Sequence, residues 1–130
     1  MPDPHSPLGP ASPLRILFVE DNEYLRETLA AMLEEDHREV RACATAEEAL
    51  EAFGQRGFDV VISDVSLPGM SGIDLARRLL ASQPALWVIL SSGYALDKGL
   101  QTLGPNVRSL PKPFELDDMD ELLAEIRAAR

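Results

Sequence analysis

The sequence predicts an α/β fold in which short parallel strands alternate with helices. Short runs of β-branched and aliphatic residues, such as residues 60–62 and 86–90, recur along the chain. Their continuous apolar character is typical of strands that are buried on both faces of a sheet. Between these runs lie longer segments with apolar residues three or four positions apart, the spacing of an amphipathic helix. This alternation, with short connections, indicates a parallel sheet that helices cover on both faces.

Five strands and five helices are expected in order, a (βα)5 chain. The strands are expected at residues 15–19, 39–44, 60–62, 86–90 and 107–110. The first helix is expected to begin at a cap at Asp21 or Asn22 and to end at about residue 35. The second is expected to run from Thr45 to the glycines at 54 and 57, and the third from Ser71 to about residue 82. The last two are expected over 95–103 and from 116 to the chain end. Leu25, Leu29, Met32 and Leu33 are expected to form the apolar face of the first helix. The commonest strand order for such a chain is the flavodoxin-like 2-1-3-4-5.

Length and composition indicate one domain with a tail. Residues 1–13 hold five of the ten prolines and are predicted to be a disordered tail, which leaves residues 14–130 for the domain. Acidic residues outnumber basic ones 22 to 12, for a net charge of −10, which argues against direct nucleic-acid binding. One cysteine excludes an intramolecular disulfide. No apolar run approaches the roughly 20 residues that span a bilayer, and no signal peptide is evident, so we expect a cytoplasmic protein without membrane contact.

Three carboxylates are expected to meet at one edge of this sheet. Glu20 and Asp21 directly follow the first strand, and Asp64 ends the third. These strands are neighbours in the expected order, and ligands of open parallel sheets bind outside the carboxyl ends of the strands. Three like charges at close range require neutralisation. Because carboxylate oxygens suit a hard divalent cation, the acids predict a Mg²⁺ site.

A hydroxyl and an ammonium are expected at the same edge. Ser92 ends the fourth strand, and Lys112 follows the fifth. A carboxylate beside a metal ion, a hydroxyl and a lysine is an arrangement that suits phosphoryl transfer, in which charge on the phosphoryl oxygens must be stabilised. An aspartate can itself accept the phosphoryl group as an acyl phosphate.

These residues occur within longer motifs that resemble the signature of response-regulator receiver domains of two-component signalling. The resemblance covers residues 14–130, and its elements appear in the family's order. The motifs are Val19-Glu20-Asp21-Asn22, Asp64 with Leu67-Pro68-Gly69-Met70-Ser71-Gly72, Ser92-Gly93 and Lys112-Pro113-Phe114.

The resemblance implies a phosphoacceptor whose donor is a phosphohistidine on a histidine kinase or a histidine phosphotransfer protein. Asp64 would accept the group. Glu20, Asp21, Asp64 and the backbone carbonyl of Ser66 would hold Mg²⁺. Ser92 would hydrogen-bond a phosphoryl oxygen and Lys112 would pair with it, with the Lys112-Pro113 bond cis as is typical of the family. The domain would catalyse its own Mg²⁺-dependent phosphorylation and dephosphorylation without being an enzyme on other substrates.

Two positions depart from the common pattern. Ser109 stands three residues before Lys112, where many receivers carry a Tyr or Phe that turns inward on activation. The aromatic half of the usual switch, which couples phosphorylation to the outer face of the domain in the family, is therefore missing here. Tyr94 lies two residues after Ser92 and, with Ser66, occupies a position that influences acyl-phosphate hydrolysis in the family. We expect the Tyr94 ring to limit water access and to lengthen the phosphorylated lifetime.

Several of these residues also allow other roles, and the chain allows other functions. Glu20 and Asp21 are also suited to cap a helix, although capping explains two adjacent acids poorly. Ser91 is adjacent to Ser92, and the following Gly93 favours Ser92. A pseudo-receiver that binds partners without phosphorylation is the main alternative function. An aspartyl phosphatase is disfavoured because its usual second acid would fall at Ser66. No output domain is expected after the last helix, so the chain would signal by protein contact as a stand-alone receiver, a phosphate relay or sink, or a part of a larger protein.

Overall fold

Five strands form a parallel sheet in the computed structural model, which describes residues 13–34, 37–93 and 102–129. The strand order is β2-β1-β3-β4-β5, which confirms the predicted fold class. The strands are β1 (Leu14–Val19), β2 (Arg38–Cys43), β3 (Val60–Asp64), β4 (Trp87–Ser92) and β5 (Val107–Pro111). Each lies within about two residues of its expected bounds.

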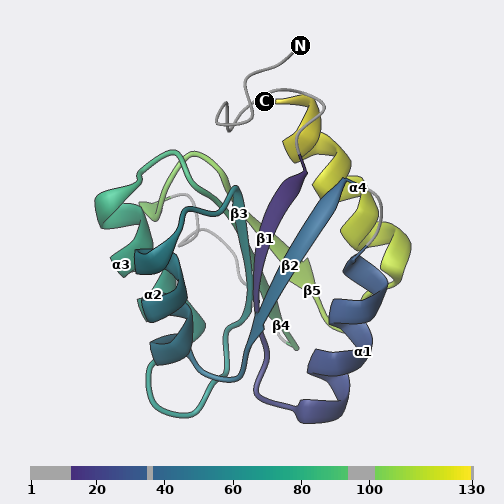
Figure 1. Cartoon of the computed structure of the whole chain (residues 1–130), viewed down its shortest axis with the longest axis horizontal. Coiled ribbons are helices and arrows are strands. Elements are labelled where there is room, and N and C mark those ends of the chain that lie inside the picture. The colour runs from purple at the N-terminus through teal and green to yellow at the C-terminus, as the bar shows by residue number, and fades with distance from the viewer. Residues whose placement is uncertain (1–12, 35–36, 94–101, 130) are drawn as a thin grey trace.

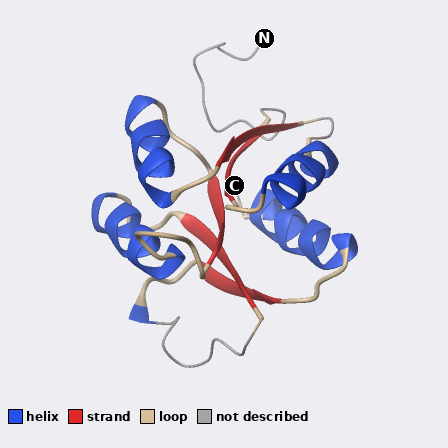
Figure 2. Ribbon diagram, turned by 90° about the horizontal axis from the view of Figure 1, so that it is seen from below, coloured by secondary structure: helices blue, strands red, loops and turns tan. Residues whose placement is uncertain are grey.

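Helices cover both faces of the sheet. The described residues contain α1 (Glu23–Leu33), α2 (Ala46–Gln55), α3 (Gly72–Ser82) and α4 (Leu116–Ala128). α2 and α3 lie on one face, and α1 and α4 lie on the other (Figures 1 and 2). The helix expected at 95–103 falls largely on residues 94–101, and the expected tail falls on residues 1–12, so both predictions lie outside the described residues.

Alternate residues of the central strands enter two separate cores. Leu17, Val61 and Leu90 pack beneath α2 and α3. Ile16, Ile62 and other alternating residues pack beneath α1 and α4. This division follows from the period of two in a strand, which sends successive side chains to opposite faces. It also explains why the central strands are continuously apolar in the sequence, because both of their faces are buried.

Side-chain caps start three of the helices. Asn22 accepts a hydrogen bond from the Leu25 amide, and Thr45 and Ser71 cap α2 and α3 in the same way. The predicted cap of the first helix is therefore Asn22 rather than Asp21. The first turn of α2 departs from a capping box, because Glu48 Oε2 accepts from the Ala44 amide at 3.0 Å rather than from the amide of the cap residue Thr45.

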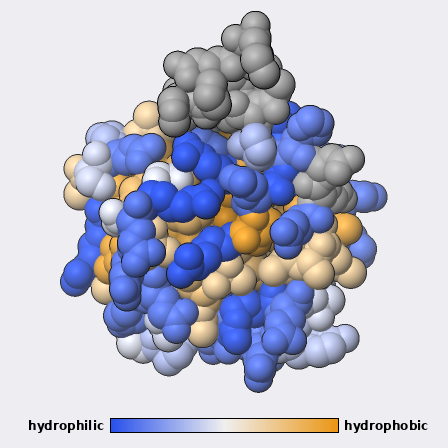
Figure 3. All heavy atoms as spheres, viewed as in Figure 1, coloured by the Kyte–Doolittle hydropathy of each residue, from blue (hydrophilic) through white to orange (hydrophobic). Residues whose placement is uncertain are grey.

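The apolar face predicted for α1 is only partly correct. Leu33 is buried and Leu29 is half-buried, but Leu25 and Met32 are exposed. Tyr24 on the same helix is 75% exposed. Among the residues that the structure describes, the large apolar side chains that are exposed, Tyr24, Leu25 and Met32, all lie on α1. The face seen in Figure 3 is largely hydrophilic. Within the described residues, no helix combines the length and apolar character needed to cross a bilayer.

Candidate functional site

Three carboxylates converge at the carboxyl ends of the two central strands. Glu20 follows β1 directly, Asp21 comes next, and Asp64 is the last residue of β3. One oxygen from each side chain lies within 4.8 Å of the corresponding oxygen of the others. The parallel register, which pairs Val19 with Ser63, brings the two strand ends to the same level. The expected clustering of these acids is therefore present.

Glu20 is held in a buried position by its local backbone. Its side chain is the most enclosed of the three acids, because the residue is only 4% exposed. Its Oε2 accepts a hydrogen bond from the Asn22 amide at 3.1 Å, and Arg26 Nη1 donates to its carbonyl at 3.0 Å. Burial raises the pKa of Glu20 above its ordinary value, and the nearby Asp21 and Asp64 carboxyls raise it further. Ionising all three acids together therefore costs free energy unless a cation joins them.

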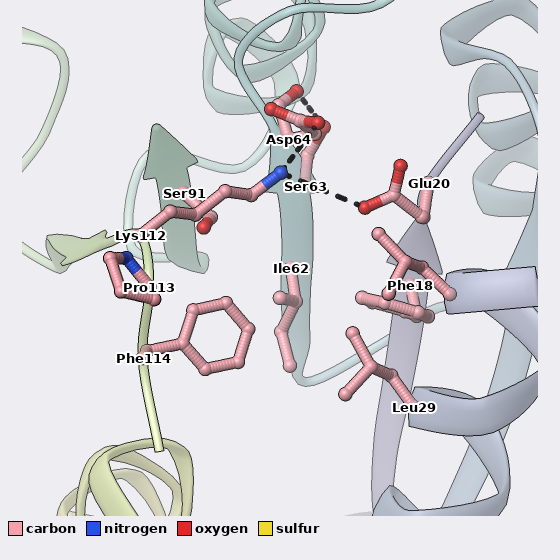
Figure 4. Close-up of a pocket in the computed structure, with 11 residues that line it drawn as sticks. Phe18, Glu20, Leu29, Ile62, Ser63, Asp64, Ser91, Lys112, Pro113 and Phe114 are labelled. Atoms are coloured by element: carbon pink, nitrogen blue, oxygen red, sulfur yellow. Dashed lines mark hydrogen bonds and ion pairs between the residues drawn. The ribbon is translucent and has the colours of Figure 1, made fainter. Parts of the chain in front are cut away.

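Lys112 supplies one cation at this edge. Its Nζ donates to Asp64 Oδ2 at 2.9 Å and lies 3.9 Å from Glu20 Oε1. The Lys112 amide donates to the carbonyl of Ser92 at 2.7 Å, which fixes the start of the loop after β5 against the end of β4. The Lys112-Pro113 bond is cis, as expected. Figure 4 shows the lysine side chain reaching over the strand ends toward both carboxylates.

The second oxygen of Asp64 contacts the β3–α3 loop. Asp64 Oδ1 accepts from the Ser66 amide at 3.2 Å, so the exposed residue Ser66 is adjacent to Asp64. The role of the Ser66 carbonyl as a metal ligand stays a prediction. Gly69 in this loop has a φ of 75°, in the left-handed region that favours glycine. The following Met70 amide donates to Glu47 Oε2 at 3.4 Å, which ties the loop to the first turn of α2.

A glycine at the start of α3 allows this helix to approach Asp64 closely. A Cβ added to Gly72 would lie 2.2 Å from the Asp64 carbonyl oxygen and 3.0 Å from Ser63 Oγ. The Gly72 amide donates to the Val65 carbonyl at 3.0 Å. Gly72 ends the motif Leu67-Pro68-Gly69-Met70-Ser71-Gly72, in which no role was predicted for it. A glycine in the first turn of a helix, directly after a strand and a turn, is a signal that could have indicated a close backbone approach.

The two adjacent serines at the end of β4 occupy different positions. Ser91 pairs in register with Asp64 and lines the same cavity as Asp64 and Lys112. Ser92, the predicted hydroxyl donor, is 3% exposed, and its carbonyl accepts the bond from the Lys112 amide. Successive residues of a strand point to opposite faces, and Ser91 is the residue paired with Asp64. The sequence could therefore have indicated that Ser91, rather than Ser92, shares a face of the sheet with Asp64. The hydrogen-bonding role of Ser92 toward a phosphoryl oxygen stays a prediction.

The donor set at this edge fits a magnesium ion. Three carboxylates within reach of one centre provide the hard oxygen ligands that Mg²⁺ prefers, and two of them, Asp21 and Asp64, retain contact with solvent for bound waters. A divalent cation would also offset the charge repulsion that raises the pKa of Glu20.

The family model of the response regulator receiver domain matches residues 16–126. The chain belongs to this family. The receiver domain is 34% identical over 131 residues to the transcriptional activator protein PfeR of Pseudomonas aeruginosa, covering 97% of this chain and 43% of PfeR. It is 34% identical over 115 residues to the sensor kinase CckA of Brucella abortus, covering 85% of this chain and 12% of CckA. The chain thus spans less than half the length of either relative.

Solved structures show the same fold. A CheY-like receiver domain protein from Methanospirillum hungatei is 27% identical, with a TM-score of 0.82, and the match covers 91% of this chain and 96% of that one. The response regulator protein TrrA from Thermotoga maritima, in complex with Mg²⁺-BeF, is 28% identical, with a TM-score of 0.76 and coverage of 86% and 97%. Phosphoacceptance and an acidic Mg²⁺ pocket are general properties of this family.

Of the two residues that depart from the family pattern, Ser109 lies within the described residues and Tyr94 does not. Ser109 is half-buried on β5, opposite Leu90, and lines a groove near α4 rather than the cavity that contains Asp64. Tyr94 lies outside the described residues. The predicted effects of both residues therefore remain predictions.

Proposed function

We propose that this receiver domain accepts a phosphoryl group on Asp64 from a phosphohistidine of a histidine kinase or a histidine phosphotransfer protein. The observation that carries the proposal is the convergence of Glu20, Asp21 and Lys112 on Asp64. An aspartate whose only role was to form a turn at the end of a strand would not explain why two further acids and a lysine surround it.

The transfer is a displacement at phosphorus. A carboxylate oxygen of Asp64 forms the new P–O bond while the P–N bond to the donor imidazole breaks, and the bond electrons remain on the imidazole nitrogen. The Lys112 ammonium, 2.9 Å from Asp64 Oδ2 in this structure, would form an ion pair with a phosphoryl oxygen after the transfer. The Ser66 amide, 3.2 Å from Oδ1, helps to fix the rotamer of the nucleophile. Such positioning and charge stabilisation are the main protein contributions to phosphoryl transfer.

Glu20, Asp21, Asp64 and the Ser66 carbonyl are the residues that would hold Mg²⁺. The ion would neutralise negative charge on the phosphoryl oxygens. The structure of the relative TrrA with Mg²⁺-BeF supports this assignment. Glu20 has a further role as the buried member of the set, because burial raises its pKa and a bound cation would offset the cost of its ionised form.

The downstream step is expected to be a protein contact. Because Ser109 replaces the inward-turning ring of many receivers, we propose that phosphorylation is transmitted here without an aromatic switch at this position. Ser92 would hydrogen-bond the phosphoryl oxygen that faces the end of β4, and its movement would change the adjoining backbone.

The proposal is tested by intact mass spectrometry of the chain incubated with Mg²⁺ and acetyl phosphate. We expect one phosphoryl adduct that is absent when EDTA is added. Asp64→Asn should abolish the adduct, whereas the matched variant Asp117→Asn, an exposed acid on α4, should retain it. Absence of the adduct in the wild-type chain would favour a pseudo-receiver. Continuous phosphate release from unrelated phosphate esters would favour a phosphatase.

A further inference from the structure

A cavity of about 430 Å³ lies beside the phosphoacceptor site, between α1, the sheet and the segment that joins β5 to α4. Figure 4 shows Phe18, Leu29, Ile62 and Phe114 around its interior, with Asp64 and Lys112 at one end. Small-molecule sites are typically concave, mainly apolar and about 300–1,000 Å³ in volume, with a few polar groups that fix the ligand. The cavity therefore has the size and lining of a small-molecule site, with an apolar interior and a polar end that it shares with the acidic cluster.

Ser91 supplies a polar group that the protein leaves unused. The residue is 5% exposed and its side chain lines the cavity. Its Oγ has no hydrogen-bond partner among the residues that the structure describes. The neighbouring strand-end serine differs, because Ser63 Oγ donates to the Asp64 carbonyl at 2.9 Å. A buried hydroxyl without a partner costs free energy, and a ligand group that reached Ser91 Oγ from the cavity would recover this cost.

The lining of the cavity indicates an uncharged occupant. The charged groups at its polar end, Glu20, Asp64 and Lys112, belong to the phosphoacceptor site, and Lys112 Nζ is already paired with Asp64 Oδ2 at 2.9 Å. Toward the interior the lining is aromatic and aliphatic, which favours an apolar body. Leu25, at 39% exposure, lies at the edge of the cavity on α1, so the occupant has a route from solvent.

We propose that this cavity binds a small, uncharged, largely apolar molecule whose hydroxyl or amide group hydrogen-bonds Ser91 Oγ. This inference goes beyond the phosphoacceptor function, because binding requires neither Mg²⁺ nor phosphorylation. The ligand would lie against Lys112 and Asp64, so its presence would alter how readily the phosphoryl group is accepted. The site would then allow a metabolite of this chemical class to modulate the receiver.

The test uses two probes of nearly equal size, benzyl alcohol and toluene, titrated into the unphosphorylated full chain and followed by amide NMR shifts. We expect both to perturb residues around the cavity. Benzyl alcohol should bind about three- to tenfold more tightly than toluene, the range given by one neutral hydrogen bond. Ser91→Ala should remove this difference while leaving toluene binding intact.

A second variant keeps the test decisive if Ser91→Ala does not fold. Leu29→Trp, on the half-buried side of α1, should fill the cavity and abolish binding of both probes with the fold retained. Equal affinity of the two probes for the wild-type chain, or shifts confined to other surfaces, would overturn the proposal and leave only ordered water in the cavity. Because no phosphodonor is present, failure here is distinct from failure of Asp64 to accept a phosphoryl group.

Discussion

The Lys112 ammonium lies 2.9 Å from Asp64 Oδ2, and it therefore neutralises the proposed phosphoacceptor before any metal or phosphoryl group arrives. Glu20 Oε1 is 3.9 Å from the same nitrogen. One positive charge is thus shared within a cluster of three acids. A Mg²⁺ ion bound at this site would therefore compete with Lys112 for the same carboxylates, while both cations would stabilise a phosphoryl group on Asp64.

Replacement of Lys112 by methionine should lower metal-free stability and raise Mg²⁺ affinity. The variant retains the apolar stem but leaves three acids without their cation. We expect a loss of about 1 kcal/mol in unfolding free energy, a modest value because the Lys112 side chain is 33% exposed. Mg²⁺ should bind about fivefold more tightly once the repulsion by the ammonium is removed. Urea unfolding and calorimetric titration measure the two effects.

Arg77→Met is the matched control for this variant, since Arg77 is an exposed cation on α3 that pairs with Asp74 rather than with the site. It should change neither quantity appreciably. Weaker Mg²⁺ binding in Lys112→Met would show that the lysine organises the acids rather than competing for them.

Magnesium affinity should fall with falling pH in a way that depends on Glu20. The folded-state pKa of Glu20 is raised above 4.5, mainly by burial. In the metal-free protein, this raised pKa stabilises the fold below pH 4.5, and the contribution is lost as pH rises through the folded pKa. Mg²⁺ requires the ionised carboxylate, so binding should release protons near the folded pKa. Titration calorimetry in buffers of different ionisation enthalpy measures this release.

Glu20→Gln should reduce Mg²⁺ affinity by at least about tenfold and diminish the proton release. It should also stabilise the metal-free protein at neutral pH, because the buried charge is removed while the bond from the Asn22 amide can persist. Glu23→Gln, an exposed acid in the first turn of α1, serves as the control. A variant that was less stable than wild type without metal would contradict the burial argument.

Gly72→Ala should disrupt the junction between β3 and α3. The added Cβ would lie 2.2 Å from the Asp64 carbonyl oxygen, so the helix start or the strand end must shift. We expect a loss of about 2–4 kcal/mol and weaker Mg²⁺ binding. Gly54→Ala is the control, because Gly54 lies in α2 with nothing within 4 Å of an added Cβ. It should stabilise the protein by about 0.5–1 kcal/mol. Equal effects of the two substitutions would contradict the close approach.

Tyr94→Ala should shorten the phosphorylated lifetime if the ring limits water access to the acyl phosphate, as its position two residues after Ser92 predicts. Decay of the adduct after removal of acetyl phosphate, followed by intact mass, measures this lifetime. Decay that is unchanged or slower in the variant would contradict the predicted role.

The strands, their order and the acidic cluster were predictable because each depends on a local pattern. Continuous apolar runs indicated central strands, and Glu20, Asp21 and Asp64 followed directly from where those runs end. The parallel arrangement then required these acids to meet. The cap residue Asn22 was one of two candidates because its side chain is suited to accept from the first-turn amides.

The remaining features depend on packing that no local pattern reports. Exposure of Leu25 and Met32 on α1 reflects how the helix lies over the sheet, whereas helical spacing only indicates that they share a side with Leu33. The unpartnered Ser91 hydroxyl depends on the absence of acceptors on the described elements around it, which the sequence does not specify. The bond from the Met70 amide to Glu47 joins segments 23 residues apart.

Chemical mapping of the phosphoryl group tests the central claim most directly. After labelling with acetyl phosphate and Mg²⁺, borohydride reduces an aspartyl phosphate to homoserine, and peptide mass spectrometry then locates the converted residue. The account predicts homoserine at position 64 alone, dependent on Mg²⁺. Conversion at Asp21 or another acid with Asp64 unmodified would contradict it.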